Sequence, residues 1–167
     1  IVVPSISWVA SVQAVIASGF EPLFVDTDNN FFLNTCQLSQ LDRYLNEIAG
    51  VMAVDFTGYI SPRYDQLIKW CHQNNILLIQ DSAQAFGAET ITAENIFKAC
   101  SVGFASCLSI NSMKLLSSHG EAGMICTDDS ELSNFAKSFR SQGCNESRMP
   151  IMFGMNLRIE TIQAAII

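Results

Sequence analysis

Charged side chains are scarce in this 167-residue chain. Asp, Glu, Lys and Arg make up 15 % of it, against roughly 25 % in soluble domains, while 49 % of its residues are hydrophobic. So few charges predict that something else covers part of the surface. Basic residues are fewer than acidic ones: 9 basic and 16 acidic residues give a net charge of -7. We expect such a chain to bind neither nucleic acid nor an anionic membrane, because it offers no basic surface.

Long apolar runs and paired cysteines are also missing. No run approaches the roughly 20 residues of a membrane-spanning helix, and the six cysteines are spaced singly, without a C-x-x-C pair. The two histidines have no second ligand at metal spacing. We therefore expect a soluble, cytoplasmic protein without a metal site, whose cysteines are reduced core thiols: Cys36, Cys71, Cys100, Cys107, Cys126 and Cys144.

Short apolar runs alternate with amphipathic helical patterns along the whole chain. The runs lack polar alternation, which is typical of strands buried on both faces of a parallel sheet, and they cover residues 1–3, 22–25, 51–55, 76–79, 103–108 and 123–126. Helical spacing of apolar residues predicts helices over 7–18, 38–48, 63–74 and a stretch that begins near Asp129. The alternation predicts an α/β fold, a mostly parallel sheet with helices on both faces.

Residues with useful chemistry follow three of the predicted strands. Asp81 and Gln84 follow the run at 76–79, Ser109 and Lys114 follow the run at 103–108, and Trp8 follows the first run. Ligands of open α/β sheets lie beyond the carboxyl ends of the strands. An acid, a lysine, a hydroxyl and a flat aromatic at one edge are what pyridoxal phosphate requires, because lysine alone can hold its aldehyde as an imine and the acid keeps its ring nitrogen protonated.

The order of these motifs resembles the sugar-nucleotide aminotransferases of the DegT/DnrJ/EryC1/StrS family, which are fold type I enzymes dependent on pyridoxal phosphate. The resemblance extends over essentially all 167 residues. It rests on V-P-S-x-S-W-V-A-S at 3–11, P-L-F-V-D-T-D at 22–28, I-Q-D-S-A-Q-A-F-G-A at 79–88, S-I-N-S-M-K at 109–114, G-E-A-G-M-I-C-T-D-D at 120–129 and G-M-N-L-R-I-E-T-I-Q-A-A at 154–165.

The resemblance implies roles for individual residues. Lys114 would be the catalytic Schiff-base lysine and Asp81 the partner of the pyridine nitrogen. The remaining cofactor-binding residues it implies are Gln84 at the ring hydroxyl, Trp8 stacked on the ring, Ser109 at the phosphate and Asn156, which reaches the phosphate of a neighbouring subunit. This last role implies a homodimer with shared active sites.

The same resemblance implies transfer of an amino group, from glutamate, to a keto group of a nucleotide-linked deoxysugar. Residues 1–167 would then be part of the large cofactor-binding domain, with an upstream segment and a smaller C-terminal domain absent. Two other functions stay open. One is a sugar dehydratase of the same family, which Lys114 disfavours because such variants carry His there. The other is a non-catalytic truncated paralogue or interaction protein that retains the fold.

Each candidate residue also has a purely structural alternative. Asp81 could cap a helix, Trp8 could belong to the core, and Gln84 and Ser109 could bond the local backbone. His119, in the loop after Lys114, is a candidate for a substrate-side role. The sequence alone leaves these alternatives open.

Overall fold

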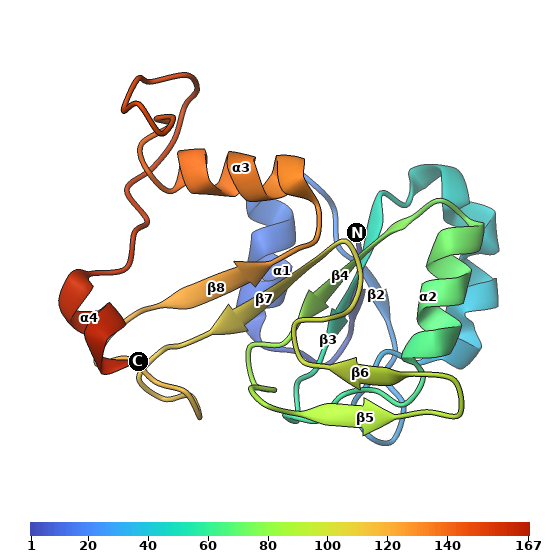
Figure 1. Ribbon diagram of the computed structural model, residues 1–167. Coiled ribbons are helices and arrows are strands. Elements are labelled where there is room, and N and C mark those ends of the chain that lie inside the picture. The colour runs from blue at the N-terminus through green and yellow to red at the C-terminus, as the bar shows by residue number, and fades with distance from the viewer.

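A six-stranded sheet organises the computed structural model, which describes residues 1–167 (Figure 1). Its strand order is β2-β1-β3-β4-β7-β8, and every neighbouring pair is parallel except β7 and β8. The strands are β1 (Val2–Pro4), β2 (Leu23–Val25), β3 (Gly50–Val54), β4 (Leu77–Asp81), β7 (Ala105–Ser109) and β8 (Gly123–Cys126). All six predicted strands are present.

The register of the central strands brings their carboxyl ends together. β3 pairs with β4 from Gly50 opposite Leu77 to Val54 opposite Asp81, and Asp81 also lies opposite Cys107 of β7. β1, β3, β4 and β7 all run in the same direction. The loops that follow these four strands therefore emerge at a single edge of the sheet.

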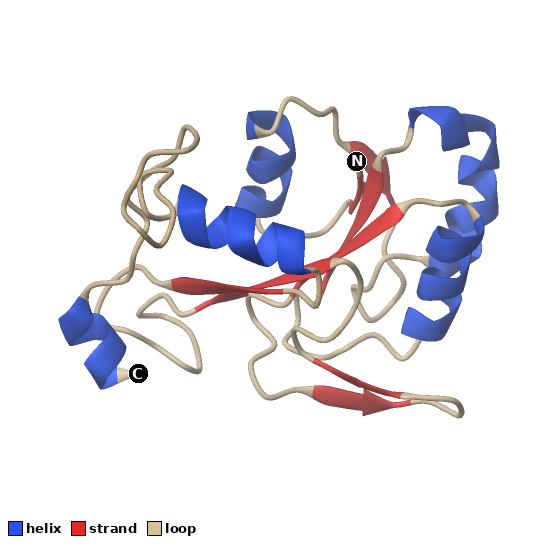
Figure 2. Cartoon of the chain, turned by 45° about the horizontal axis from the view of Figure 1, so that its top comes forward, coloured by secondary structure: helices blue, strands red, loops and turns tan.

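Helices cover both faces of this sheet, as predicted. Figures 1 and 2 show α1 (Val9–Ala17) and α3 (Ser130–Phe139) on one face, and α2 (Tyr64–Gln73) with a 3₁₀ helix, η1 (Thr35–Glu47), on the other. α4 (Thr161–Ile166) lies near the end of the chain. Asp129 caps α3 by accepting the Leu132 N–H at 2.6 Å. No helix has both the length and the apolar character needed to cross a membrane.

Two elements differ from the sequence prediction. The α-helix predicted over 38–48 is η1, a 3₁₀ helix. Leu38, Leu41 and Tyr44 recur every three residues, which matches the three residues per turn of a 3₁₀ helix, and the two leucines are buried. The sequence analysis also missed a small antiparallel hairpin, β5 (Glu89–Ile91) with β6 (Ile96–Lys98), which lies beside the main sheet in Figure 2.

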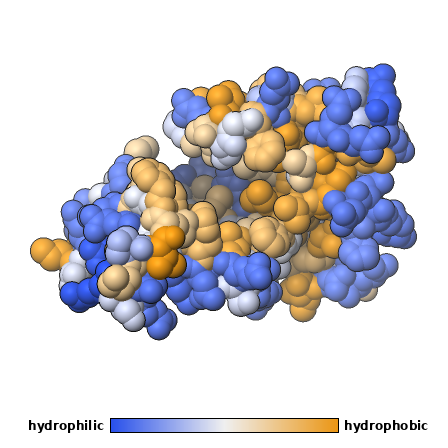
Figure 3. All heavy atoms as spheres, turned by 90° about the horizontal axis from the view of Figure 1, so that it is seen from above, coloured by the Kyte–Doolittle hydropathy of each residue, from blue (hydrophilic) through white to orange (hydrophobic).

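The hydrophobic core lies between the sheet and one of its two helical layers. A cluster of 17 buried residues includes side chains of η1 and α2 but none of α1, α3 or α4. On the opposite face α3 has no buried residue, and Ile16 of α1, Ile125 of β8 and Phe135 of α3 are each more than half exposed. Figure 3 shows apolar residues gathered around a hollow on the side where α3 lies in Figure 1. This open face accounts for the shortage of charge.

All six cysteines are free in the structure. Their predicted place in the core is confirmed for Cys71, which is buried, but wrong for Cys36, which is exposed. Cys36 lies in the first turn of η1, where its N–H bonds the side chain of Asn34 and its sulfur faces Arg63. The other four are partly buried.

Gly103 permits the close approach of β7 to β4. Its φ is +82°, and a Cβ built there would collide with the carbonyl oxygen of Leu78, which accepts the Phe104 N–H at 2.8 Å. We expect Gly103→Ala to lower the free energy of unfolding by about 3 kcal/mol, because strain and a backbone collision add. Gly19→Ala is the control, since φ is +79° there but no atom lies within 4 Å. Thermal unfolding that shows equal losses for both variants would contradict the collision.

Candidate active site

A cleft lies at the edge of the sheet where the parallel strands end. Its volume is about 340 Å³, part of it open to solvent. The segments that follow β1, β3, β4 and β7 all contribute to its wall. The side chains in it that are polar or aromatic enough to bind a ligand are Trp8, Ser11, Asp55, Phe56, Asp81, Gln84 and Lys114.

Lys114 and Gln84 meet in this cleft. Lys114 lies in the loop after β7 and Gln84 in the turn after β4, and the Lys114 Nζ donates a hydrogen bond to Gln84 Oε1 at 2.9 Å. The Asn111 carbonyl accepts the Lys114 N–H at 2.9 Å, which fixes the backbone of the loop. Gln84 therefore holds the amine over the cleft and does not bond the local backbone.

Asp81 lies at the last position of β4 and faces the same cleft. Its Oδ2 accepts the Ser11 hydroxyl of α1 at 2.8 Å, and its Oδ1 accepts the Ala83 N–H at 3.1 Å. The Cys107 thiol lies 3.7 Å from Oδ1. Burial, followed by the nearby Asp81 charge, raises the pKa of Cys107 to about 12, so this thiol keeps its proton and can donate it. Three elements thus fix the carboxylate.

Trp8 stands at the N-terminal cap of α1 with 65 % of its surface exposed. It lines the cleft together with Lys114 and Asp81. A side chain with this exposure is not part of the core, which removes the structural alternative for Trp8. Its ring is available to stack on a flat ligand in the cleft.

Ser109 and Asn156 are not among the residues that line the cleft. Ser109 ends β7, and its hydroxyl accepts the Asn111 N–H at a long 3.4 Å. Asn156 is exposed and bridges to Ser141 in the segment between α3 and α4. His119 is also exposed, and its N–H bonds Gln163 Oε1 at 2.7 Å. The structure thus brings together Trp8, Asp81, Gln84 and Lys114, and leaves these three outside.

Three of the seven polar or aromatic cleft residues were not predicted from the sequence: Ser11, Asp55 and Phe56. Ser11 is a small polar residue four positions before Val15, on the one buried stripe of α1, and a hydroxyl on such a stripe signals a buried partner. Asp55 directly follows β3 just as Asp81 ends β4. The predicted strand over 51–55 included Asp55, so Asp55 did not count among the residues that follow a strand.

Asp55 is the more deeply buried of the two carboxyl groups in the cleft, with 1 % of its surface exposed. Burial raises its pKa from the ordinary 3.8 to about 6, although hydrogen bonds from Tyr64, Gln80 and Ser82 lower it in part. The Asp81 charge nearby raises it a little further. This carboxyl group therefore gains and loses its proton close to neutral pH.

The raised pKa of Asp55 predicts a pH dependence of stability. Between pH 3.8 and about 6 the folded chain binds this proton more tightly than the unfolded chain, so the contribution is complete below pH 3.8 and is lost as the pH rises through 6. The loss amounts to about 3 kcal/mol. Urea unfolding of the wild type and of Asp55→Asn from pH 4 to 8 measures it. A variant with the same slope as the wild type would contradict the assignment.

No cluster of three or more His, Cys, Asp or Glu side chains is placed to hold a metal ion.

The comparison with known proteins matches the whole chain, residues 1–167, to the model of the DegT/DnrJ/EryC1/StrS aminotransferase family. The chain belongs to this family. The resemblance read from its motifs is thereby confirmed.

The relatives of this DegT/DnrJ/EryC1/StrS family chain include enzymes of known activity. A GDP-perosamine synthase of Caulobacter vibrioides is 33 % identical over 170 residues, 99 % of this chain and 43 % of the relative. Among solved structures, a DegT DnrJ EryC1 StrS aminotransferase of Brucella abortus matches with a TM-score of 0.87 and 27 % identity, over 98 % of this chain and 44 % of the other. An aminotransferase of Helicobacter pylori involved in the biosynthesis of pseudoaminic acid matches with a TM-score of 0.86 and 25 % identity. This match covers 98 % of this chain and 43 % of the other.

These matches show the fold to be that of the family's aminotransferases. The chain spans less than half the length of the relatives, between 43 % and 44 % for the three just described. Its core, its sheet and the cleft at the sheet edge all lie within the matched region.

Proposed function

We propose that this chain forms the pyridoxal phosphate site of an aminotransferase that acts on a nucleotide-linked keto sugar, with glutamate as the amino donor. The observation that carries the proposal is the shared cleft of Lys114, Gln84 and Asp81, with Trp8 at its rim. An amine, an amide, a carboxylate and an aromatic face are the donor set that such a cofactor needs. When bound, it supplies an electron sink for a carbanion at the donor carbon.

Lys114 moves the proton in this proposal. Its Nζ lies within hydrogen-bond reach of Gln84, 2.9 Å away, so the amine stays directed at the cleft before and after proton transfer. Met113 and Leu115 on either side are 90 % and 82 % exposed, so their side chains do not pack against Lys114. Gln84 is therefore proposed to orient both Lys114 and the ring hydroxyl of the cofactor.

Asp81 holds the opposite end of the cofactor. The Ser11 hydroxyl donates to its Oδ2 and the Ala83 N–H donates to its Oδ1, and these two hydrogen bonds fix the plane of the carboxylate. A fixed carboxylate stabilises a protonated ring nitrogen more than a mobile one does, because no reorganisation is needed as charge develops. Trp8 is proposed to stack on the ring and to exclude water from one face.

Ser109 and Asn156 are proposed to serve the phosphate, Ser109 in its own subunit and Asn156 in the neighbouring one. The exposed position of Asn156, outside the cleft lining, supports its proposed role in a neighbouring chain. The open apolar face beside α3 supports a homodimer with shared sites, because an unpaired face of this kind favours association.

We further propose that residues 1–167 form only part of the large domain of a longer protein. The share of each relative that the chain spans, 43 % for the GDP-perosamine synthase, supports this division. An upstream segment would complete the phosphate site, and a smaller C-terminal domain would close over the sugar. The substrate class rests on the relatives, whose names include a GDP-perosamine synthase and a UDP-4-amino-4,6-dideoxy-N-acetyl-beta-L-altrosamine transaminase.

A spectroscopic titration tests the proposal. The protein made from the full reading frame is loaded with pyridoxal phosphate, and its visible absorbance is followed as L-glutamate is added. We expect glutamate to remove the visible band and a nucleotide-linked keto sugar to restore it, whereas the same sugar without its nucleotide does not. Binding without any response to an amino acid would contradict the transferase. Absence of binding would favour the non-catalytic alternative.

A further inference from the structure

The structure contains a buried polar cluster behind Asp81 that the proposed reaction does not use. Its centre is Asp55, whose Oδ1 accepts the Tyr64 hydroxyl at 2.9 Å. The Oδ2 of Asp55 accepts Gln80 Nε2 at 2.8 Å and the Ser82 hydroxyl at 3.1 Å. Gln80 and Ser82 have no exposed surface, and no buried side-chain polar atom of the protein lacks a partner. Fully satisfied networks of this kind are rigid and specify one arrangement.

Asp55 therefore bonds both neighbours of Asp81 in the sequence. Side chains alternate along a strand, so Gln80 and Ser82 point to one side of β4 while Asp81 points to the other, into the cleft. The Asp55 N–H also donates to the Asp81 carbonyl at 2.9 Å. Asp55 thus makes one hydrogen bond with each residue of segment 80–82, and we call these three bonds the Asp55 clamp.

The far side of the clamp is anchored as well. Gln80 Oε1 accepts the Val102 N–H at 3.1 Å and the Ser106 hydroxyl at 3.3 Å. Ser82 Oγ accepts the Cys100 N–H at 3.2 Å. The clamp consequently ties the end of β4 to β3 on one side and to the segment before β7 on the other.

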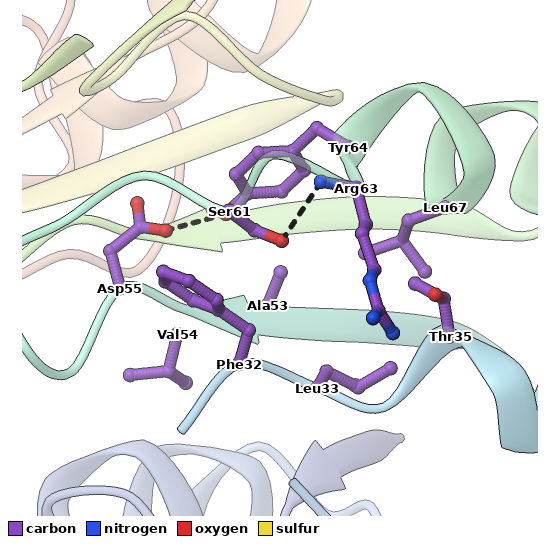
Figure 4. Close-up of a pocket in the computed structure, with 10 residues that line it drawn as sticks. All are labelled: Phe32, Leu33, Thr35, Ala53, Val54, Asp55, Ser61, Arg63, Tyr64 and Leu67. Atoms are coloured by element: carbon purple, nitrogen blue, oxygen red, sulfur yellow. Dashed lines mark hydrogen bonds between the residues drawn. The ribbon is translucent and has the colours of Figure 1, made fainter. Parts of the chain in front are cut away.

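Asp55 lies in the wall between two cavities. It lines the cleft, and it also lines a second cavity of about 240 Å³, drawn in Figure 4, where the Asp55 carboxyl group points toward Tyr64. The titratable groups near it are Tyr64 of α2, Asp81 of β4, Cys100 in the segment after β6, Arg63 across the second cavity and Lys114 across the cleft. Tyr64 and Cys100 are neutral, because burial raises the pKa of each. Arg63 faces Asp28 at 4.0 Å. No cation bonds Asp55 directly.

We propose that Asp55 is a positioning residue, which through its clamp on residues 80–82 keeps the Asp81 carboxylate directed at the ring nitrogen of the cofactor and adds its own negative charge behind it. This proposal rests on the proposed function, because Asp81 is the nitrogen partner only there. Loss of the clamp lets segment 80–82 relax and removes a charge that favours a cation in the cleft.

Cofactor binding to the loaded protein tests the positioning role. Asp55→Asn keeps the shape of the side chain but removes its charge and leaves one acceptor oxygen in place of two, so it cannot accept the bonds from Tyr64, Gln80 and Ser82 together. We expect it to weaken pyridoxal phosphate binding by about 10- to 100-fold at pH 7.5, the range typical when a residue that orients a binding group is lost. We expect the wild-type affinity to fall as the pH drops through about 6, where Asp55 takes up its proton, and we expect Asp55→Asn to lose this step. Equilibrium absorbance titrations from pH 5 to 8 measure both.

Tyr64→Phe is the matched control, because it removes one buried hydrogen bond to Asp55 but leaves the bonds to Gln80 and Ser82. We expect it to lower the thermal unfolding temperature, to keep the wild-type affinity at pH 7.5 and to move the pH step upward, because the Tyr64 bond lowers the Asp55 pKa. If Tyr64→Phe weakens binding as much as Asp55→Asn, or if Asp55→Asn binds like the wild type, the positioning role is wrong.

A second measurement does not depend on the cofactor. The ¹³C carboxyl resonance of Asp81 in the cofactor-free protein, assigned with Asp81→Asn, reports the surroundings of this group. We expect Asp55→Asn to shift or split the resonance and Tyr64→Phe to leave it in place. An unchanged Asp81 resonance in Asp55→Asn would overturn the clamp. If the wild type binds no pyridoxal phosphate but this resonance responds as expected, the clamp stands and the proposed function fails.

Discussion

Replacing Lys114 by alanine is expected to lower the rate of amino transfer by more than about 10³-fold. The cleft offers no second amine, since Lys114 is the one lysine among its lining residues. Its loss removes both the covalent attachment of the cofactor and the group that carries the proton at Nζ. Single-turnover rates with glutamate, and peptide mass spectrometry after borohydride reduction, measure the two losses separately.

Two other variants make this prediction specific. Lys114→Arg keeps the positive charge near Gln84 but cannot hold the aldehyde, so we expect it to fail as completely as alanine does. Lys98→Ala removes a lysine of the hairpin strand β6, away from the cleft, and is expected to keep full activity. A borohydride-fixed cofactor that persists in Lys114→Ala would show that another residue is the attachment point.

Most of the fold is predictable from the sequence because the strands are short runs rich in apolar residues. All six strands were located from these runs, β8 with both of its ends. The predicted burial on both faces is confirmed for β1 and β3 but wrong for β4 and β7, which alternate, and for β8, which is mostly exposed. The end of a buried strand is also where polar residues with a function first reach solvent. Asp81, Gln84 and Lys114 were found for this reason, and the structure places them in one cleft.

The elements that escaped prediction are those whose shape depends on tertiary contacts. The hairpin strands β5 and β6 have three residues each and mix polar with apolar side chains, so no period can be read from them. The sequence does not reveal the 3₁₀ form of η1 either, because the spacing of Leu38, Leu41 and Leu45 also fits one face of an α-helix. Packing of Leu38 and Leu41 against the sheet decides between the two forms.

Ser11 and Asp55 show a different limit of sequence reasoning. Each acts on Asp81, Ser11 by a direct hydrogen bond and Asp55 by its bonds to both neighbours of Asp81. Ser11 is 70 residues away from Asp81 in the chain, and Asp55 is 26 residues away from it. A pattern of residue types after each strand finds groups that face a ligand. The contacts of Asp55 become visible only when the register of β3 and β4 is known, and that of Ser11 only when the place of α1 on the sheet is known.

Asp81→Asn is expected to lower kcat/KM by about 10³-fold, because the asparagine keeps the shape of the side chain but loses the charge that stabilises a protonated ring nitrogen. The fold should survive, since Asn can still accept the Ala83 N–H through its oxygen. Ser11→Ala is the graded comparison: it removes one hydrogen bond to Oδ2 and leaves the charge, so we expect a loss of about tenfold. Steady-state kinetics of the wild type, Asp81→Asn and Ser11→Ala measure the two losses in kcat/KM, and thermal unfolding of the same three proteins checks that each is folded. If Ser11→Ala cost as much as Asp81→Asn, the orientation of this carboxylate, and not its charge, would be the larger contribution to the reaction.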